Sequence, residues 1–176
     1  MQVLIQKLHQ KTFGDFKIEV VAVITNKPDA KGVEKAEALG VDVIMIDHKA
    51  YENREDFDTK LVAEIEALEV DLVVLAGFMR ILTPVFTSHI KAINIHPSLL
   101  PAFKGAKALE RSYHDSASLV GVTTHFVVQE VDGGEIIAQK SFDKSGMGFE
   151  QFKAKIHACE HELFAESVVK VIASSP

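Results

Sequence analysis

Runs of β-branched and other apolar residues alternate with helix-forming segments along the first half of this chain. The clearest run is Ile18–Ile24, which is nearly all Val, Ile and Ala, and similar runs cover residues 41–46, 71–76 and 90–95. Uninterrupted apolar runs of this length are typical of strands that are buried on both faces of a parallel sheet. Strands that alternate with helices need crossover connections. The pattern therefore predicts an α/β fold, a doubly wound and mostly parallel sheet with helices on both faces.

Helices are expected where apolar residues recur at three- and four-residue spacings. These segments are residues 1–10, 30–39, 54–69, 106–115 and 149–173. A turn is predicted at residues 26–29. Two later strands, residues 120–128 and 135–142, flank Asp132-Gly133-Gly134, which favours a more antiparallel closing part of the sheet. No linker or repeat is visible, so we expect a single domain over residues 1–176.

Composition narrows the classes of function. The chain is 47% hydrophobic and 25% charged, as in ordinary globular proteins, and its formal net charge of -6 disfavours a nucleic-acid partner. The longest apolar run, Leu72–Met79, is shorter than the roughly 20 residues that cross a bilayer. The single cysteine, Cys159, has no partner for an internal disulfide, which favours a reducing compartment. We therefore expect a cytoplasmic protein with no membrane and no nucleic-acid partner.

The N-terminus departs from the usual nucleotide-binding pattern. Doubly wound sheets that bind nucleotides normally begin with a strand and a glycine-rich turn that places a phosphate at a helix N-terminus. This chain begins on the helix, and it contains neither a GxGxxG nor a Walker-type loop. We therefore expect no dinucleotide or nucleoside triphosphate site, and a sheet that lacks its first strand.

The segment Asn94–Pro101 has the highest density of residues suited to catalysis. It follows a predicted strand, and ligands of open α/β sheets bind beyond the carboxyl ends of strands. Asn94 and His96 share one side of that strand by alternation. An asparagine amide can donate to a developing oxyanion, and a histidine can move a proton near neutral pH. The alternative is that His96 only hydrogen-bonds at a strand end while Asn94 caps a turn.

A carboxylate 36 residues after His96 favours the catalytic interpretation. Asp132 precedes two glycines that permit close backbone approach, and an aspartate beside a histidine favours the imidazolium form. Taken alone, Asp-Gly-Gly is more often a simple turn.

Three motifs together resemble the phosphoribosylglycinamide formyltransferase family. They are Leu75–Pro84 (LAGFMRILTP), Asn94–Pro101 (NIHPSLLP) and Asp132–Gly134 followed by Ile136-Ile137. The similarity runs from about Ile18 to the C-terminal helix. The Asn-x-His…Asp set is shared by the wider formyltransferase family, so residues 76–84 discriminate better between acceptors.

This resemblance implies a function and a site. The donor would be 10-formyltetrahydrofolate, the acceptor the amine of glycinamide ribonucleotide, and no metal would be needed. The catalytic residues would be Asn94, His96 and Asp132. The folate site would comprise Arg54, Met79, Arg80, Ile81, Leu82, Asn94, Val128, Gln129, Glu130, Val131 and Asp132. The ribonucleotide would contact His157, Ala158, Cys159 and Glu160, of which Glu160 matches the family better than His157.

The family's strand and phosphate loop before the first helix have no counterpart here, and we expect a native start upstream of Met1. The resemblance also leaves alternatives open. Formyltetrahydrofolate deformylase would pass the formyl group to water, and a non-catalytic folate-binding domain would keep only the pocket. A methionyl-tRNA formyltransferase is disfavoured, because neither a trailing domain nor a basic patch is present. We expect this chain to be a monomer or weak homodimer.

Three residue-level alternatives remain. His157–His161 fits the H-x-x-E-H pattern of one class of zinc peptidases, although no third ligand is evident. His125 is interpreted as a packed strand histidine near the site, and Arg80 is either a folate contact or an ordinary cation at a helix start.

Overall fold

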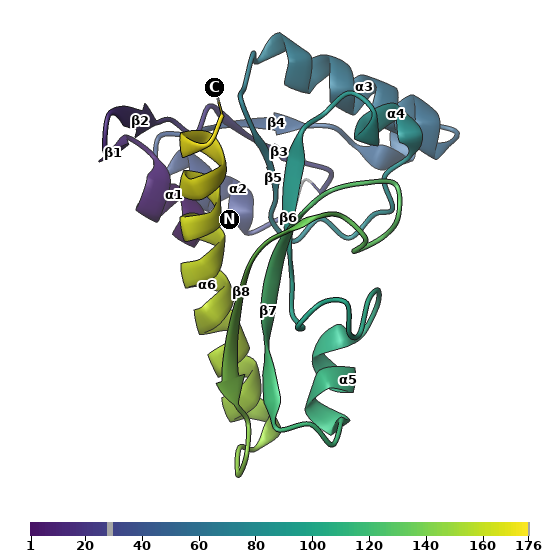
Figure 1. The fold of residues 1–176 in the computed structure, drawn as a ribbon. Coiled ribbons are helices and arrows are strands. Elements are labelled where there is room, and N and C mark those ends of the chain that lie inside the picture. Colours follow the sequence, from purple (N-terminus) through teal and green to yellow (C-terminus); the bar gives the residue numbers. More distant parts are fainter. Residues whose placement is uncertain (28–29, 176) are drawn as a thin grey trace. The chain divides into compact units, whose positions relative to one another are not determined.

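The computed structural model describes residues 1–27 and 30–175 (Figure 1). Pro28 and Asp29 of the predicted turn lie outside the described residues. The chain forms two compact units, and each is described by itself. Unit 1 comprises residues 1–71 and 79–90, and unit 2 comprises residues 72–78 and the chain from residue 91 onward.

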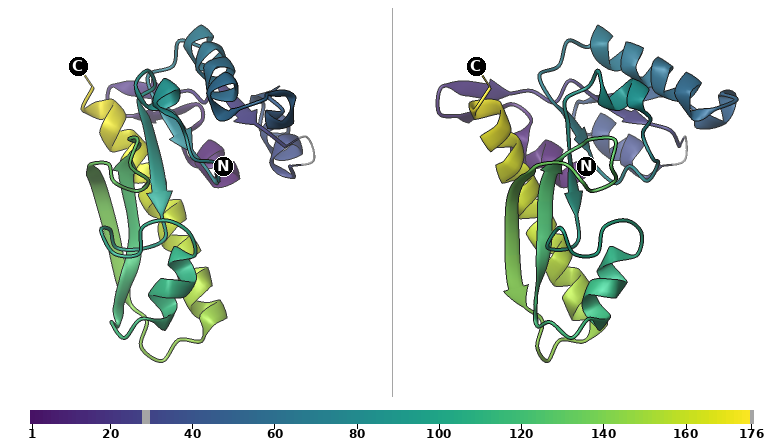
Figure 2. Two further views of the ribbon diagram at one scale, coloured as in Figure 1. Left: turned by 90° about the vertical axis from the view of Figure 1, so that its right-hand side faces the viewer. Right: turned by 45° about the vertical axis from the view of Figure 1, so that its right-hand side comes forward.

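Unit 1 combines a parallel strand pair with short and long helices (Figure 2). The parallel pair is β3 (Ala22–Thr25) with β4 (Asp42–Met45), and an antiparallel hairpin is formed by β1 (Lys11–Phe13) and β2 (Phe16–Ile18). Its helices are α1 (Gln2–Leu8), α2 (Gly32–Glu37), the 3-10 turn η1 (His48–Ala50), α3 (Arg54–Ala67) and α4 (Pro84–Thr87). Ile5, Ala36 and Val41 form one buried core cluster.

The prediction of one buried strand over residues 18–24 is wrong. The run is divided between β2 and β3, and the residues of β3 are only half-buried. The backbone amide of Val20 donates to Nδ1 of His9 over 3.1 Å, so a side chain takes the hydrogen bond that a strand ladder would use. Gly14, with φ of +59°, forms the tip of the hairpin that pairs β2 with β1. Local apolarity therefore identified strand residues but not the break between them.

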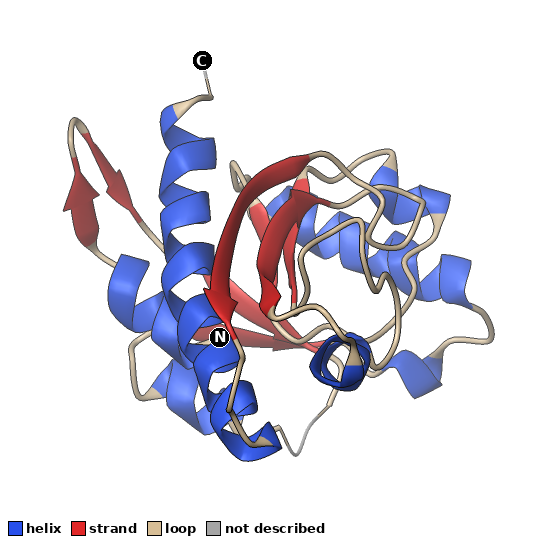
Figure 3. Ribbon diagram, turned by 60° about the horizontal axis from the view of Figure 1, so that its bottom comes forward, coloured by secondary structure: helices blue, strands red, loops and turns tan. Residues whose placement is uncertain are grey.

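Unit 2 is a four-stranded sheet in the order β5-β6-β7-β8 with two helices. Figure 3 draws the strands of the chain in red and its helices in blue. The strands are β5 (Val73–Leu75), β6 (Ala92–His96), β7 (Leu119–Phe126) and β8 (Ile136–Asp143), and the helices are α5 (Ala108–His114) and α6 (Phe149–Ala173). β5 and β6 are parallel, whereas β6 with β7 and β7 with β8 are antiparallel pairs. The predicted antiparallel closing part is therefore confirmed.

The core of unit 2 lies between α6 and the β7–β8 pair. Val120 and Val122 of β7 pack against Phe152, Ile156 and Leu163 of α6, and all five are buried. The hydroxyls of Thr124 and Ser167 are 2.7 Å apart across the same interface. This packing fixes β7, and through β7 it fixes the position of β6. None of the helices among the described residues has an apolar stretch long enough to cross a membrane.

Candidate active site

The candidate site lies in unit 2, where β6 ends between two neighbouring strands. Asn94 is paired with Leu75 of β5 on one side and with His125 of β7 on the other. His96, two residues further along β6, is paired with Thr123. Because residues two apart leave the same face of a strand, Asn94 and His96 share a face, as the sequence predicts. Two loops, residues 97–107 and 127–135, follow β6 and β7.

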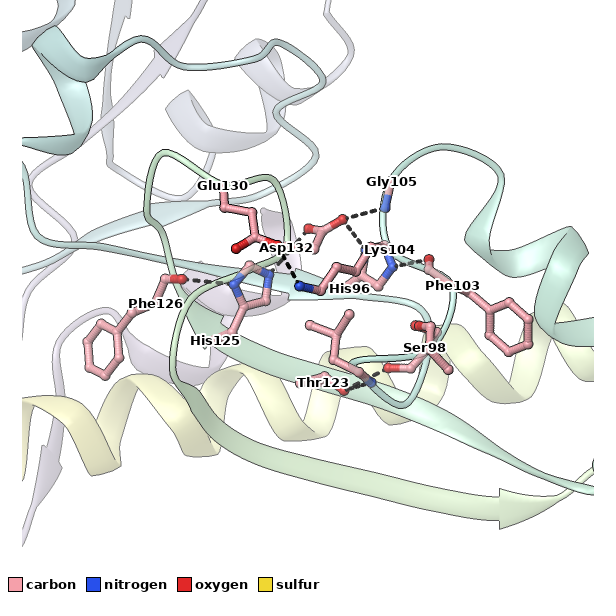
Figure 4. A network of polar contacts seen from close by, with 12 residues as sticks. His96, Ser98, Phe103, Lys104, Gly105, Thr123, His125, Phe126, Glu130 and Asp132 are labelled. Atoms are coloured by element: carbon pink, nitrogen blue, oxygen red, sulfur yellow. Dashed lines mark hydrogen bonds and ion pairs between the residues drawn. The ribbon is translucent and has the colours of Figure 1, made fainter.

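Both ring nitrogens of the buried His96 face oxygen acceptors (Figure 4). Nδ1 lies 3.3 Å from Oδ2 of Asp132, and Nε2 lies 2.9 Å from the carbonyl oxygen of Phe103. A neutral imidazole carries one N–H, whereas the imidazolium carries two. The protonated ring is therefore the form that can donate to both acceptors.

Asp132 connects the histidine to both loops. Its Oδ2 also accepts a hydrogen bond from the amide of Gly105 at 2.8 Å, and its Oδ1 lies 3.5 Å from Nε2 of His125. Burial by itself raises the pKa of this carboxyl. The contact with His125, the Gly105 amide and the positive charge of His96 outweigh burial, so that the pKa of Asp132 is lower than its ordinary value. The carboxylate is therefore charged at neutral pH.

His125 is more closely tied to the site than the sequence predicts. Its Nδ1 donates to the carbonyl oxygen of Phe126 at 2.9 Å. Its buried Nε2 faces Asp132 at ion-pair distance but has no hydrogen bond within the described residues. The sequence signal was the position of His125 in a strand just before Asp132. Only the β6–β7 register, which puts His125 opposite Asn94, shows that it lies beside the site.

Asn94 is half-buried within β6, and its side-chain amide makes no hydrogen bond to any described residue. It therefore does not cap a turn, and the amide is available to a ligand. His96 and Asp132 are in contact, and Asn94 is paired with the histidine that faces Asp132. The structure thus brings the imidazole and the carboxylate into contact at the end of β6, the strand that also carries Asn94.

The predicted folate residues lie in both units. In unit 1, Arg54 begins α3, and the side chains of Met79 and Ile81 are exposed. The guanidinium of Arg80 lies 5.0 Å from the centre of the Phe57 ring, a cation–π contact rather than a helix start. Leu82 completes the unit 1 segment of residues 79–82, whereas Gln129 lies in unit 2, in the loop after β7.

In unit 2, Val128 and Val131 are exposed, and Glu130 is ion-paired with Lys104 at 2.8 Å. Whether these residues bind folate stays a prediction.

The predicted acceptor residues lie on α6 in two different environments. Nδ1 of His157 is 2.8 Å from Oε2 of Glu160 on the helix surface, and Ala158 is also exposed. Cys159 is packed in the core, where burial raises the pKa of its thiol. Among the described residues, no group of three potential metal ligands from His, Cys, Asp and Glu is gathered, at the H-x-x-E-H pattern or elsewhere.

Comparison with known proteins shows to which protein family this chain belongs. The chain belongs to the formyl transferase family, whose model matches residues 1–168. The resemblance noted in the sequence and the α/β formyltransferase fold are both confirmed.

Several relatives of this chain are named phosphoribosylglycinamide formyltransferases. The Escherichia coli enzyme is 38% identical over 148 residues, which are 82% of this chain and 70% of that protein. The crystal structure of the Campylobacter jejuni enzyme has a TM-score of 0.95 and 51% identity, covering 97% of this chain and 90% of that one. The trifunctional purine biosynthetic protein adenosine-3 of Bos taurus is 41% identical over 158 residues, 88% of this chain. This chain spans only 16% of that longer protein.

Proposed function

We propose that this chain transfers the formyl group of 10-formyltetrahydrofolate to the amine of glycinamide ribonucleotide, a step of purine biosynthesis. The observation that carries the proposal is the contact between His96 and Asp132 at the end of β6, the strand that also carries Asn94. The names of the relatives support the choice of acceptor. The folate derivative is the co-substrate, and the chemistry below requires no metal.

The reaction makes one carbon–nitrogen bond and breaks another. The acceptor amine attacks the formyl carbon, whose carbonyl oxygen becomes an oxyanion in a tetrahedral intermediate. The intermediate then collapses, N10 of the folate leaves with the bonding electron pair and takes a proton, and the new amide nitrogen has lost one. No covalent bond to the protein is needed, so stabilisation of the oxyanion and transfer of one proton are the tasks of the site.

Asn94 and His96 supply donors for the oxyanion. The Asn94 amide has no competing partner among the described residues. Nε2 of His96 must exchange the Phe103 carbonyl for the substrate oxygen, while Nδ1 stays with Asp132. Because the carboxylate remains charged, it holds the imidazolium and positions a water that relays the proton from amine to N10.

Correct orientation of the two bound reactants contributes the rest of the rate acceleration. Effective molarities imply that holding two reactants correctly can lower the barrier by roughly 7 to 11 kcal/mol. On this proposal Arg54, residues 79–82 and residues 128–132 hold the folate. His157, Ala158 and Glu160, on the outer face of α6, hold the ribonucleotide, whereas the buried Cys159 supports the helix from the core. The proposed partners are these small molecules alone, without nucleic acid or membrane. We further propose a cytoplasmic monomer or weak homodimer.

The test follows an isotopically labelled formyl group on the folate. The purified chain is incubated with this donor, with and without glycinamide ribonucleotide, and the label is located in formylated ribonucleotide or in formate. We expect label in the ribonucleotide only, and only when the acceptor is present. Formate released at the same rate without acceptor would establish the deformylase. Binding of a folate analogue with no label transferred would establish a non-catalytic folate-binding domain.

A further inference from the structure

A three-residue segment, residues 103–105, contacts both members of the catalytic pair. The carbonyl oxygen of Phe103 accepts from His96, and the amide of Gly105 donates to Asp132 (Figure 4). The Lys104 side chain between them is ion-paired with Glu130 on the loop that carries Asp132. The geometry of His96 and Asp132 therefore depends on where this segment lies.

The segment has a backbone conformation that needs support. Phe103 has φ of +59° and Gly105 has φ of +77°. Glycine adopts the left-handed region readily, but a phenylalanine there is strained by its Cβ. Such a conformation persists only where surrounding contacts hold it in place.

Arg111 of α5 provides those contacts. Its Nη2 donates to the carbonyl oxygen of Phe103 at 2.8 Å and also to the carbonyl oxygen of Lys104. The guanidinium carbon lies 5.8 Å from the centre of the Phe103 ring. One side chain thus binds two successive carbonyls and the ring of the strained residue, from a helix that is itself outside the site.

We propose that Arg111 is a positioning residue for the His96–Asp132 pair. It holds residues 103–105 so that the Phe103 carbonyl orients the imidazole and the Gly105 amide orients the carboxylate. Arg111 also lets His96 move. A carbonyl oxygen has two lone pairs, and Phe103 keeps the arginine as a donor when Nε2 turns to the oxyanion. The role in turnover rests on the proposed function, whereas the role in positioning does not.

The experiment compares Arg111→Ala and Arg111→Lys with a matched control, Lys144→Met. Lys144 is also a cation that donates to backbone carbonyls, those of Ser112, Tyr113 and Asp115 at the end of α5, but it contacts neither residue of the pair. Each variant is measured for kcat, for the KM of both substrates, and for the exchange rate of the Gly105 amide proton by NMR.

For Arg111→Ala we expect kcat to fall by about tenfold or more, with both KM values nearly unchanged, because misplacement of catalytic groups by a fraction of an ångström slows the chemical step. The Gly105 amide should exchange faster, and added methylguanidinium should restore part of kcat. The kcat of Arg111→Lys should lie between those of wild type and Arg111→Ala, since an ammonium group reaches one carbonyl more readily than two. Lys144→Met should lower the melting temperature with kcat and Gly105 exchange close to wild type.

Two results would overturn the inference. One is a wild-type kcat together with a protected Gly105 amide in Arg111→Ala. The other is an equal loss of kcat in Lys144→Met, which would mean that the stability of α5 alone matters. If Arg111→Ala does not fold, Arg111→Lys decides by the same two readouts. If the wild-type chain transfers no formyl group, the proposed function fails, and Gly105 exchange still tests the positioning role.

Discussion

Replacing Gly134 with alanine tests whether the loop after β7 must lie where the structure places it. A Cβ at this position would lie 1.8 Å from the carbonyl oxygen of Phe126, whereas ordinary van der Waals contact begins at 3.4 Å. The obstructing atom belongs to the backbone and cannot rotate away. The two segments must therefore separate by about 1.6 Å.

That separation would reach the site. The same Phe126 oxygen accepts from Nδ1 of His125, and Asp132 lies two residues before Gly134. A displacement of about 1 Å can cost on the order of a hundredfold in rate. A hundredfold loss corresponds to about 2.7 kcal/mol of activation free energy. Overpacking of this kind also lowers the free energy of unfolding by about 1–3 kcal/mol.

The assay measures kcat of formyl transfer and urea unfolding, with Gly148→Ala as the matched control. A Cβ at Gly148 would meet nothing within 4 Å, and its φ of -72° suits alanine. We expect about a hundredfold lower kcat for Gly134→Ala and a nearly wild-type kcat for Gly148→Ala. A wild-type kcat and an unchanged unfolding midpoint in Gly134→Ala would refute the reasoning.

Two further predictions concern buried carboxylates. Because the folded-state pKa of Asp132 is lowered, its charge stabilises the folded protein above the unfolded pKa, and this contribution is lost as the pH falls through the folded pKa. Asp132→Asn should therefore unfold at a lower urea concentration than wild type near pH 7. The gap should shrink as the pH falls below the unperturbed aspartate pKa of about 3.9. A gap independent of pH would contradict the lowered pKa. Asp58 accepts from the amide of Thr83 at 2.6 Å while almost fully buried. Asp58→Ala should lower the free energy of unfolding by about 1–3 kcal/mol, and Asp58→Asn by less because it keeps an acceptor; equal losses would show that the hydrogen bond is not the cause.

Apolar residues that recur at three- and four-residue spacings predicted the longer helices well. The stripe through Phe149, Phe152, Ile156 and Leu163 predicted a helix over residues 149–173, and α6 has those bounds. Its apolar face is long enough that one packing arrangement, against β7 and β8, satisfies it. By contrast, Ile18–Ile24 could not reveal its break, because the hydrogen bond from Val20 to His9 joins residues eleven apart in the chain.

The candidate site was predictable in its residue types but not in its contacts. Asn94, His96 and Asp132 could be chosen because their side chains suit one reaction and their motifs match one family. The position of His125 beside Asp132 depends on the β6–β7 register. The hydrogen bond between His96 and the Phe103 carbonyl depends on the left-handed conformation of Phe103. The turn at Phe103 leaves no local signal, since phenylalanine rarely adopts that conformation. The position of His125 just before Asp132 is a signal, but it does not give the register, which is a property of two strands.

The central claim is that Asp132 acts through His96, and a double-variant cycle on kcat tests it most directly. His96→Ala alone should lower kcat by about 10²- to 10⁴-fold. If the two side chains act as one unit, the double variant His96→Ala with Asp132→Ala should be scarcely slower than His96→Ala alone. Losses that multiply, so that each substitution costs the same factor with or without the other, would contradict the account.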